Sequence, residues 1–529
     1  MPRHFNVAGP NNPEWHYTLP ALARLPQVEQ LVAERSWFVL HAPRQTGKTT
    51  AMRALAQELT ASGHYAALWA TCEAGEPFRR EPAIVERLVC DAIATSASLH
   101  LPEELRPPPA PSNAAVGSMV AAYLRAWCET SPRPVVLLLD EIDALQDEAL
   151  ISVLRQLRGM YPNRPAAAPS TIALIGLRDV RDYKVASGGS PHLGTASPFN
   201  IKAESLTLAS FSEDDVRALY ALHTAETGQE LAPEALELIF QVTQGQPWLV
   251  NALGYQLQRK MGIEGRVEAA HVERAKELLI LSRSTHLDSL ADKLNEPRVR
   301  AVIAPILAGD EVPMSVAMRD IEYCIDLGLL AADTRSLRIA NPIYREVLPR
   351  ELTAPTQIRI VLPSRRWALP DGRLDLQGLL DALVAFWRQN GEWMVVGQDW
   401  PEAAHQIVLM AFLQRVVNGG GTIEREYGLG RGRLDLLIRW ALTVDQYGGA
   451  RTEERHAIEV KVWRDGQKDP LPKGLEQLDG YLERLGLRAG TLILFDARSG
   501  SPTGEGWETR GEFGEAMSPG GRLVTVLRL

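Results

Sequence analysis

Apolar and polar residues follow two alternating patterns over the first 200 positions of the chain. Short uninterrupted apolar runs are typical of buried strands, and they alternate with stretches in which apolar residues recur at helical spacing. Met52, Leu55, Ala56 and Leu59 form one such amphipathic stretch. The apolar runs occupy residues 37–40, 66–70, 135–139 and 171–175. Strands and helices that alternate in this way predict a layered α/β domain.

The pattern becomes helical between about residues 211 and 350. Ser212 is a good N-cap, and the acidic residues that follow it suit the positive end of a helix dipole. Residues 321–344 read as a helix, a tight turn and a short β-hairpin, which is the order of a winged helix. Such a module is as compatible with a packing lid as with reading DNA, so the pattern alone assigns no role.

A second α/β pattern follows a weakly periodic segment that contains proline and arginine. Its elements are helices at 379–389 and 402–417, strands at 422–427, 434–440 and 456–463, a helix at 474–485 and a strand at 491–495. A chain of 529 residues is long enough for about three cores. We predict an α/β domain at 1–210, a helical lid and winged-helix-like region at 211–350, a linker at 351–373 and a second α/β domain at 374–529.

The composition of the chain limits the class of protein and the cellular compartment that we expect. The chain has 45% hydrophobic and 23% charged residues, which is ordinary for a globular protein. Its four cysteines are widely spaced and have no matched histidine pairs, which argues against a disulfide framework or zinc site and favours a reducing compartment. The N-terminus lacks the apolar core of a signal peptide, and the longest apolar run is far shorter than the ~20 residues that span a bilayer. We therefore expect a cytoplasmic protein without a membrane partner.

A loop with phosphate-binding character follows the first apolar run and opens a helix. Its residues are Ala42, Pro43, Arg44, Gln45, Thr46, Gly47, Lys48, Thr49 and Thr50. In this setting backbone N–H groups cradle nucleotide phosphates, Lys48 reaches their oxygens and Thr49 ligates Mg²⁺. Ala42 stands where a P-loop has its first glycine, and we expect the geometry to survive because alanine tolerates many of the same backbone angles. The alternative is a chance Gly-Lys-Thr at an ordinary strand-to-helix turn.

Two acidic residues end the apolar run at 135–139. Asp140 would hold Mg²⁺ through water, and Glu141 would polarise the attacking water. Buried strands that end in Asp-Glu also occur by chance. The two motifs together favour a site that binds ATP and Mg²⁺.

With these motifs in place, residues 5–349 resemble the AAA-like ATPases, including their STAND-type branch, and the resemblance implies a P-loop three-layer α/β/α domain with a helical lid. It assigns residues 176–179 to the sensor-1 region, where Arg178 replaces the usual polar residue and would contact the γ-phosphate or pair with Asp179. Gly245-Gln246-Pro247 is similar to the GxP lid motif, whose proline lies near the adenine in that branch. The alternative for a single G-x-P is a turn, and no arginine finger can be assigned.

Carboxylates and a lysine mark a second candidate site in the C-terminal pattern. Asp435 lies in one predicted strand, and Glu459 and Lys461 lie two residues apart in the next, so these two share a face. If the strands pair, two carboxylates and an ammonium converge, which suits Mg²⁺ and a lysine that steers a water or stabilises developing charge. An ion pair on an edge strand is the common alternative.

Residues 402–495 resemble the PD-(D/E)XK restriction-like nuclease superfamily, whose core has the element order predicted above. Gln477 and Tyr481 match the QxxxY feature of its exonuclease-like branch, and the resemblance adds Gln477 to the catalytic residues. Glu402 matches an additional metal-binding acid, with Glu424 and Glu426 as competing candidates. Four arginines surround Asp435 and would line a phosphate path or be solvated and paired: Arg425, Arg431, Arg433 and Arg439. Trp440 and Trp463 are interpreted as caps of the sheet's core rather than as base-stacking residues.

These observations predict an ATPase that controls a Mg²⁺-dependent nuclease, with nucleic acid, DNA ahead of RNA, as the partner of the C-terminal domain. Defence against foreign DNA or mobile-element biology would be the setting. The net charge of −9 argues against broad non-specific binding, so contacts would need a local basic stripe. The alternative is a STAND-like signalling switch or scaffold whose nuclease-like domain binds a partner without cutting. Whether the chain is a monomer or a homo-oligomer is left open.

Overall fold

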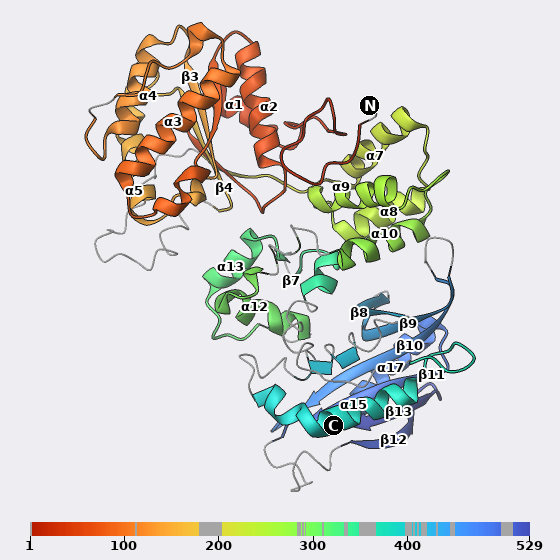
Figure 1. Cartoon of the computed structure of the whole chain (residues 1–529). Helices are drawn as coiled ribbons and strands as arrows, with labels where there is room; N and C mark the ends of the chain where they lie inside the picture. Colours follow the sequence, from red (N-terminus) through yellow and green to blue (C-terminus); the bar gives the residue numbers. More distant parts are fainter. Residues whose placement is uncertain are drawn as a thin grey trace. The chain divides into compact units, whose positions relative to one another are not determined.

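The chain forms two compact units (Figure 1). The first comprises Met1–Lys260 with the short segments Glu264–Arg266 and Asp326–Gly328, and the second comprises Met261–Ile263, Val267–Ile325 and Leu329–Leu529. The computed structural model describes residues 3–111, 114–178, 204–282, 287, 290, 292–308, 312–332, 337–348, 367–396, 405, 408–409, 412–413, 421–429, 432–444, 450–498 and 511–529. Residues 308, 332, 389–396, 421–429, 432–435, 443–444 and 450–451 are described by their backbone alone.

A parallel five-stranded sheet lies at the centre of the first unit. Its strands are β1 (Phe38–His41), β2 (Ala66–Thr71), β3 (Val135–Asp140), β4 (Thr171–Gly176) and β5 (Glu204–Thr207), in the order β2-β3-β4-β1-β5. All four neighbouring pairs are parallel, which places the carboxyl ends of β1 and β3 at one edge with β4 between them. The predicted α/β fold and the predicted strands β1 to β4 are confirmed, whereas β5 was not predicted.

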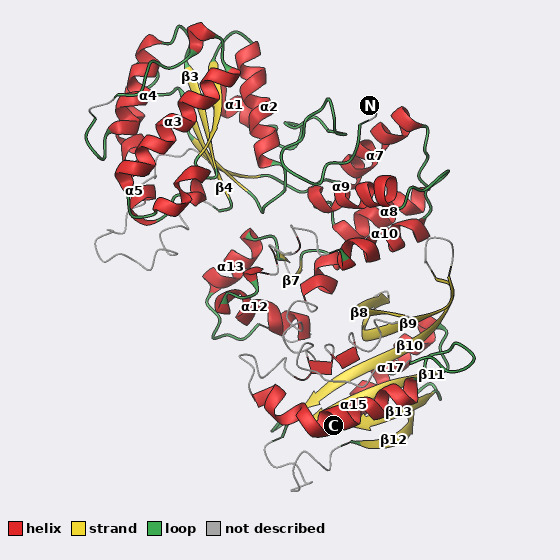
Figure 2. Ribbon diagram, in the orientation of Figure 1, coloured by secondary structure: helices red, strands yellow, loops and turns green. Residues whose placement is uncertain are grey.

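Helices cover both faces of this sheet, as Figure 2 shows. They are α1 (Val28–Ala33) and α2 (Lys48–Ala61) on one face, and α3 (Pro82–His100), α4 (Met119–Thr130) and α5 (Asp147–Met160) on the other. The residues at β1 divide between the two cores with a period of two: Trp37, just before the strand, and Val39 pack with α3 to α5, while Phe38 and Leu40 pack with α1 and α2. The layers are therefore α/β/α.

Three helices follow β5 within the first unit: α7 (Glu213–Thr227), α8 (Pro233–Thr243) and α9 (Pro247–Tyr255). We call them the lid helices. Ser212 caps α7 as predicted, because its hydroxyl accepts a hydrogen bond from Asp215 N at 3.1 Å. The Asp215 carboxylate accepts in return from Ser212 N at 2.9 Å.

The second unit begins with helices and a hairpin. They are α10 (Ala269–Leu281), α12 (Pro297–Ala308), α13 (Met318–Asp326) and the antiparallel strands β6 (Leu330–Ala332) and β7 (Leu337–Ile339). The helix, turn and hairpin predicted at 321–344 are present, and their assignment to a winged helix stays a prediction. Most of the predicted linker lies outside the described residues.

A mixed six-stranded sheet follows, in the order β12-β13-β11-β10-β9-β8. Its strands are β8 (Gly421–Leu429), β9 (Gly432–Val444), β10 (Ala450–Trp463), β11 (Ala489–Asp496), β12 (Glu512–Met517) and β13 (Leu523–Arg528). Helix α15 (Leu376–Val396) packs on one face and α17 (Leu471–Leu485) on the other. The predicted order of three strands, a helix and a strand is confirmed. The helix predicted at 402–417 lies largely outside the described residues.

The sequence pattern missed β12 and β13. Both are short, and β12 is almost wholly exposed, so it lacks the alternation of buried and exposed positions that reveals a strand. No helix within the described ranges is both long and apolar enough to cross a membrane.

Candidate functional site

The loop between β1 and α2 forms the first candidate site. It begins after His41 and ends at Gly47, which has a φ of 94° that favours glycine. Ala42 is buried and has no positive φ, and its N–H bonds to Gly176 O at 3.4 Å. Alanine therefore occupies the position of the expected glycine without backbone strain. Gln45 does adopt a left-handed φ of 60°.

Lys48 folds back over this loop. Its Nζ donates hydrogen bonds to Ala42 O at 2.7 Å and Pro43 O at 2.9 Å. Burial lowers the pKa of Lys48 to about 8, against the opposing effect of nearby carboxylates such as Asp143 and Asp140. A desolvated ammonium whose hydrogen bonds go to carbonyl oxygens would be stabilised by an anion that enters the loop.

Thr49 and Asp140 join the loop to the end of β3. Thr49 Oγ1 donates to Asp140 Oδ2 at 2.6 Å, and Trp69 Nε1 on β2 donates to the same oxygen at 3.0 Å. Asp140 is 1% exposed, and its other oxygen accepts from Glu141 N at 2.9 Å. A hydroxyl and a carboxylate beside a phosphate-binding loop are the oxygen ligands that suit Mg²⁺. The residues present therefore fit this ion.

Glu141 follows β3 with a left-handed φ of 53°. Partial burial, together with the carboxylates of Glu73, Asp140 and Asp143, raises the pKa of Glu141 to about 7. Its Oε2 accepts from Thr71 Oγ1 at 3.4 Å, and the side chain still reaches solvent. A carboxylate with a pKa near neutrality suits a general base.

The remaining predicted nucleotide contacts lie in two places. Arg178 follows the end of β4 and is partly buried, while Asp179, its alternative partner, lies outside the described residues. Pro247 is the first residue of α9 and is buried, and Gln246 caps that helix by accepting from Leu249 N at 2.6 Å. The assignments of Arg178 to the γ-phosphate and Pro247 to the adenine stay predictions.

An N-terminal segment, residues 3–18, contacts both α2, the helix that follows the phosphate-binding loop, and the lid helices. The sequence analysis did not identify this segment. We call it the N-terminal strap. Asn11 N donates to Thr50 Oγ1 on α2 at 3.2 Å, while Val7 O accepts from Trp248 Nε1 on α9 at 3.0 Å. Aromatic residues in an otherwise polar N-terminus were the available signal, since Phe5 and Tyr17 are both buried.

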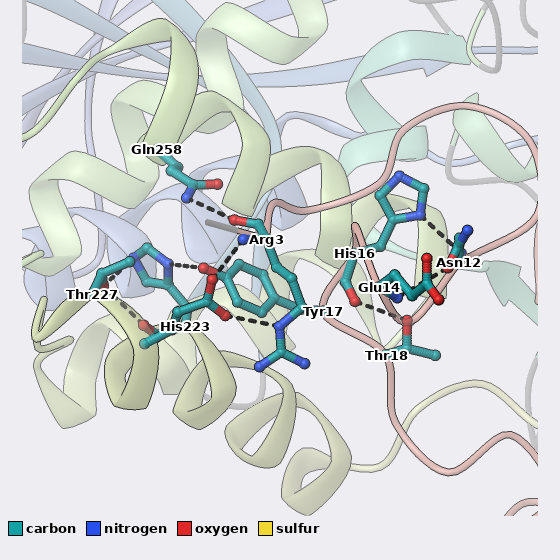
Figure 3. A network of polar contacts seen from close by, with 10 residues as sticks. Arg3, Asn12, Glu14, His16, Tyr17, Thr18, His223, Thr227 and Gln258 are labelled. Atoms are coloured by element: carbon teal, nitrogen blue, oxygen red, sulfur yellow. Dashed lines mark hydrogen bonds and ion pairs between the residues drawn. The ribbon is translucent and has the colours of Figure 1, made fainter. Parts of the chain in front are cut away.

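Figure 3 shows contacts between this strap and the lid helices. Arg3 Nε pairs with Glu226 on α7 at 2.8 Å, and the Tyr17 hydroxyl lies 3.1 Å from His223 Nδ1. Gly254 on α9 faces the Phe5 ring so closely that an added Cβ would lie 2.5 Å from it. The strap therefore packs directly against the lid helices.

The second candidate site lies on β9, β10 and α17 in the second unit. Glu459 is 1% exposed, and its Oε1 accepts from Lys461 Nζ at 2.6 Å. Leu436 on β9 is the register partner of Ile458 on β10. Continuing this antiparallel register places the backbone of Asp435, which precedes Leu436, opposite Glu459. The predicted pairing of the two strands is confirmed.

Gln477 on α17 belongs to the same neighbourhood. Its helix packs on β10, and an added Cβ at Gly474, one turn earlier, would lie 3.5 Å from Lys461 Cγ. Gln477 Oε1 is buried and has no hydrogen-bond partner among the described residues. An acceptor in this state is a natural position for a bound water or a ligand donor.

Other predicted members of this site are placed differently. The side chains of Asp435, Glu424, Glu426, Arg425 and Arg433, and the whole of Arg431 and Glu402, lie outside the described parts. Arg439 Nε pairs with Glu453 at 2.8 Å, as the alternative of a paired arginine predicted. Trp440 belongs to the core beneath α15. Among the side chains that are described, no three His, Cys, Asp or Glu residues form a metal cluster.

Comparison with known proteins gives only weak similarities. No family model and no curated protein matches the chain. The Walker-type ATPase PABY2304 of Pyrococcus abyssi is 13% identical with a TM-score of 0.47, over 65% of this chain and 99% of that one. The Aeropyrum pernix ORC1 protein, in complex with DNA, is 16% identical with a TM-score of 0.35, over 65% and 95%. The Thermotoga maritima RuvB Holliday junction branch migration motor is 15% identical with a TM-score of 0.33, over 64% and 93%. Similarities of this size do not assign the chain to a family.

Proposed function

We propose that the protein binds ATP with Mg²⁺ in the loop between β1 and α2 and hydrolyses it. The observation that carries this proposal is the 2.6 Å hydrogen bond between Thr49 and Asp140, which joins the two sequence motifs into one site. The parallel sheet brings the ends of β1 and β3 to one edge, but the direct bond there also requires a hydroxyl in one motif and a carboxylate in the other. The buried Lys48 beside them supplies the positive charge that phosphates require.

Each residue of the site has a role in this proposal. The N–H groups of the loop and of the α2 N-terminus bind the phosphates, and Lys48 turns from its carbonyl partners to their oxygens. Thr49 would hold Mg²⁺ directly and Asp140 would hold it through water, and the ion would neutralise the charge that develops on the phosphates. Glu141 accepts a proton from the attacking water, for which its pKa of about 7 is well matched.

The test is ATP binding and release of inorganic phosphate by the purified full chain. We expect Lys48→Ala to weaken ATP binding strongly, and Glu141→Gln to bind ATP but to hydrolyse it at least about a hundredfold more slowly. Arg217→Gln, which removes an exposed ion pair on α7, is the matched control and should behave as the wild type. A wild-type chain that binds no nucleotide would refute the proposal.

We further propose that the C-terminal domain is a PD-(D/E)XK-like nuclease that requires Mg²⁺. The supporting observation is the buried Glu459 and its pairing with Lys461, in register with Asp435 and beside the unpartnered Gln477 Oε1. Burying an ion pair costs more free energy than burying apolar residues of similar volume. A purely structural role therefore does not explain why this pair is buried here. Asp435 and Glu459 would hold the metal, and Lys461 would orient the attacking water.

Cleavage of labelled linear and circular DNA and of RNA, with Mg²⁺ and with and without ATP, tests this second proposal. Cutting that is lost in Lys461→Ala would support it, and a change of cutting in Lys48→Ala would support control by ATP. If the wild type hydrolyses ATP but cuts no substrate, the nuclease proposal fails. The chain would then be better explained as an ATP-dependent signalling switch whose C-terminal domain binds a partner.

A further inference from the structure

We propose that Arg24 is a positioning residue that couples the phosphate-binding loop to the lid helices, so that ATP in the loop stabilises α9. This inference rests on the proposed binding of ATP and adds to it a route by which the nucleotide acts on the lid. Arg24 lies before α1 and belongs to no motif in the sequence.

Arg24 bridges two segments that are far apart in the chain. Its Nη1 donates to Thr46 O in the loop at 3.0 Å and to Ala209 O, between β5 and α7, at 2.8 Å. Its Nη2 would lie 3.0 Å from a Cβ added at Gly47. The guanidinium therefore contacts the main chain of the loop at Thr46 and Gly47, just before Lys48.

A second contact extends the connection to the lid. The Arg24 guanidinium lies 4.8 Å from the centre of the Phe211 ring, a cation–π distance. Phe211 N in turn donates to Gly245 O at 2.8 Å, just before the cap of α9. A Cβ added at Gly245 would lie only 1.8 Å from Phe211 O, so this approach requires glycine. The contacts thus run from the loop through Arg24 and Phe211 to the N-terminus of α9.

The electrostatics of Arg24 make this connection sensitive to an anion. Burial lowers the pKa of Arg24 to about 10, and the carboxylate of Asp215 opposes this effect only in part. Within the described residues its hydrogen bonds go to carbonyl oxygens. Phosphates bound in the loop would place negative charge close to this desolvated cation and stabilise it in its bridging position. By reciprocity, a lid held in place by Arg24 would favour ATP binding.

The N-terminal strap gives the lid helices a separate attachment to α2, through Val7 and Asn11. Figure 3 shows the further contacts of Arg3 and Tyr17 that hold the strap on α7. Loss of Arg24 should therefore not detach the lid in the free protein. Its effect should be confined to the state with nucleotide bound, which separates coupling from simple structural support.

The test compares the full-length wild type with Arg24→Gln and Arg24→Lys, and with Arg217→Gln as a matched surface control. We measure affinity for a fluorescent ATP analogue, the thermal midpoint without nucleotide, and hydrogen exchange of residues 245–255 with and without saturating ATP. In the wild type, ATP should slow exchange in this segment. In Arg24→Gln, we expect affinity to fall about tenfold, a usual size for coupling between sites, and the slowing by ATP to disappear at saturation. Arg24→Lys keeps the positive charge but loses the planar guanidinium group. It should therefore restore the affinity for ATP more than it restores the protection of residues 245–255 from hydrogen exchange.

Three results would overturn the inference. Unchanged affinity and unchanged protection in Arg24→Gln would show that Arg24 does not couple the two parts, while the ATP proposal would stand. Equal loss of protection with and without ATP, with a lower thermal midpoint, would show plain structural support. Should Arg24→Gln fail to fold, Phe211→Leu serves instead, because it leaves the bonds of Arg24 to Thr46 and Ala209 in place. Full protection of α9 by ATP in that variant would equally contradict the coupling. A wild type that binds no ATP would instead refute the proposed function.

Discussion

Thr49 and Asp140 lie 91 positions apart in the chain, and a 2.6 Å hydrogen bond joins their side chains. The parallel order β3-β4-β1 makes this contact possible, because it brings the end of β3 and the start of α2 to the same sheet edge. Trp69 donates to the same Asp140 oxygen, so that oxygen is held from two sides. The pair defines where a divalent cation would bind and gives the most direct tests of the site.

Replacing the Thr49 hydroxyl should weaken Mg²⁺-dependent hydrolysis. Thr49→Val keeps the shape of the side chain but offers the metal no oxygen, so we expect at least a tenfold loss of activity at limiting Mg²⁺. Thr49→Ser retains the hydroxyl and should stay close to the wild type. The measurement is ATP hydrolysis over a Mg²⁺ titration. Equal Mg²⁺ curves for the valine and serine variants would contradict the role of Thr49.

The indole of Trp69 should set how well Asp140 holds the cation. Trp69→Phe keeps a ring beneath Arg53 but removes the N–H that reaches Asp140 Oδ2. Because removing a hydrogen bond that orients a metal ligand typically costs about 10–100-fold in metal affinity, we expect the Mg²⁺ concentration for half-maximal hydrolysis to rise about tenfold or more. Arg53→Gln removes the contact with the ring and leaves the indole N–H, so it is the control. A shift of the same size in both variants would assign the effect to packing instead.

The rate of ATP hydrolysis should rise with pH and level off above about pH 7. Glu141 can accept a proton only as the carboxylate, and its pKa is raised to about 7, so the active form is lost as the pH falls below that value. Glu73 contributes to this shift through its negative charge. In Glu73→Gln the midpoint of the profile should therefore move to lower pH, which kcat measured between pH 5.5 and 9 would reveal. An unmoved midpoint, or one moved upwards, would exclude Glu141 as the titrating group.

Local patterns in the sequence predicted what depends on neighbouring residues. The strand that ends in Asp140, the loop that ends at Lys48 and the shared face of Glu459 and Lys461 all follow from spacing along one element. The contacts of the strap and of Arg24 could not be predicted in this way, because their partners lie far away in the chain. Arg24 in addition binds carbonyl oxygens, which every residue carries, so no residue type marks its partners.

Breaking the Glu459–Lys461 pair should destabilise the protein as well as abolish the proposed cleavage. Lys461→Met removes the ammonium that faces the buried Glu459 carboxylate, and breaking a buried pair in this way costs about 3 kcal/mol. Glu459→Gln combined with Lys461→Met removes both charges, so it should regain most of this loss while remaining unable to cut DNA. Urea denaturation followed by a probe of the C-terminal domain measures the first effect, and cleavage of labelled DNA measures the second.

Arg439→Gln, which breaks the more exposed pair with Glu453, is the control and should cost about 1 kcal/mol or less. A double variant as unstable as Lys461→Met alone would show that packing, and not the buried charge, sets the stability here, whereas a double variant that still cuts DNA would remove these residues from the nuclease proposal.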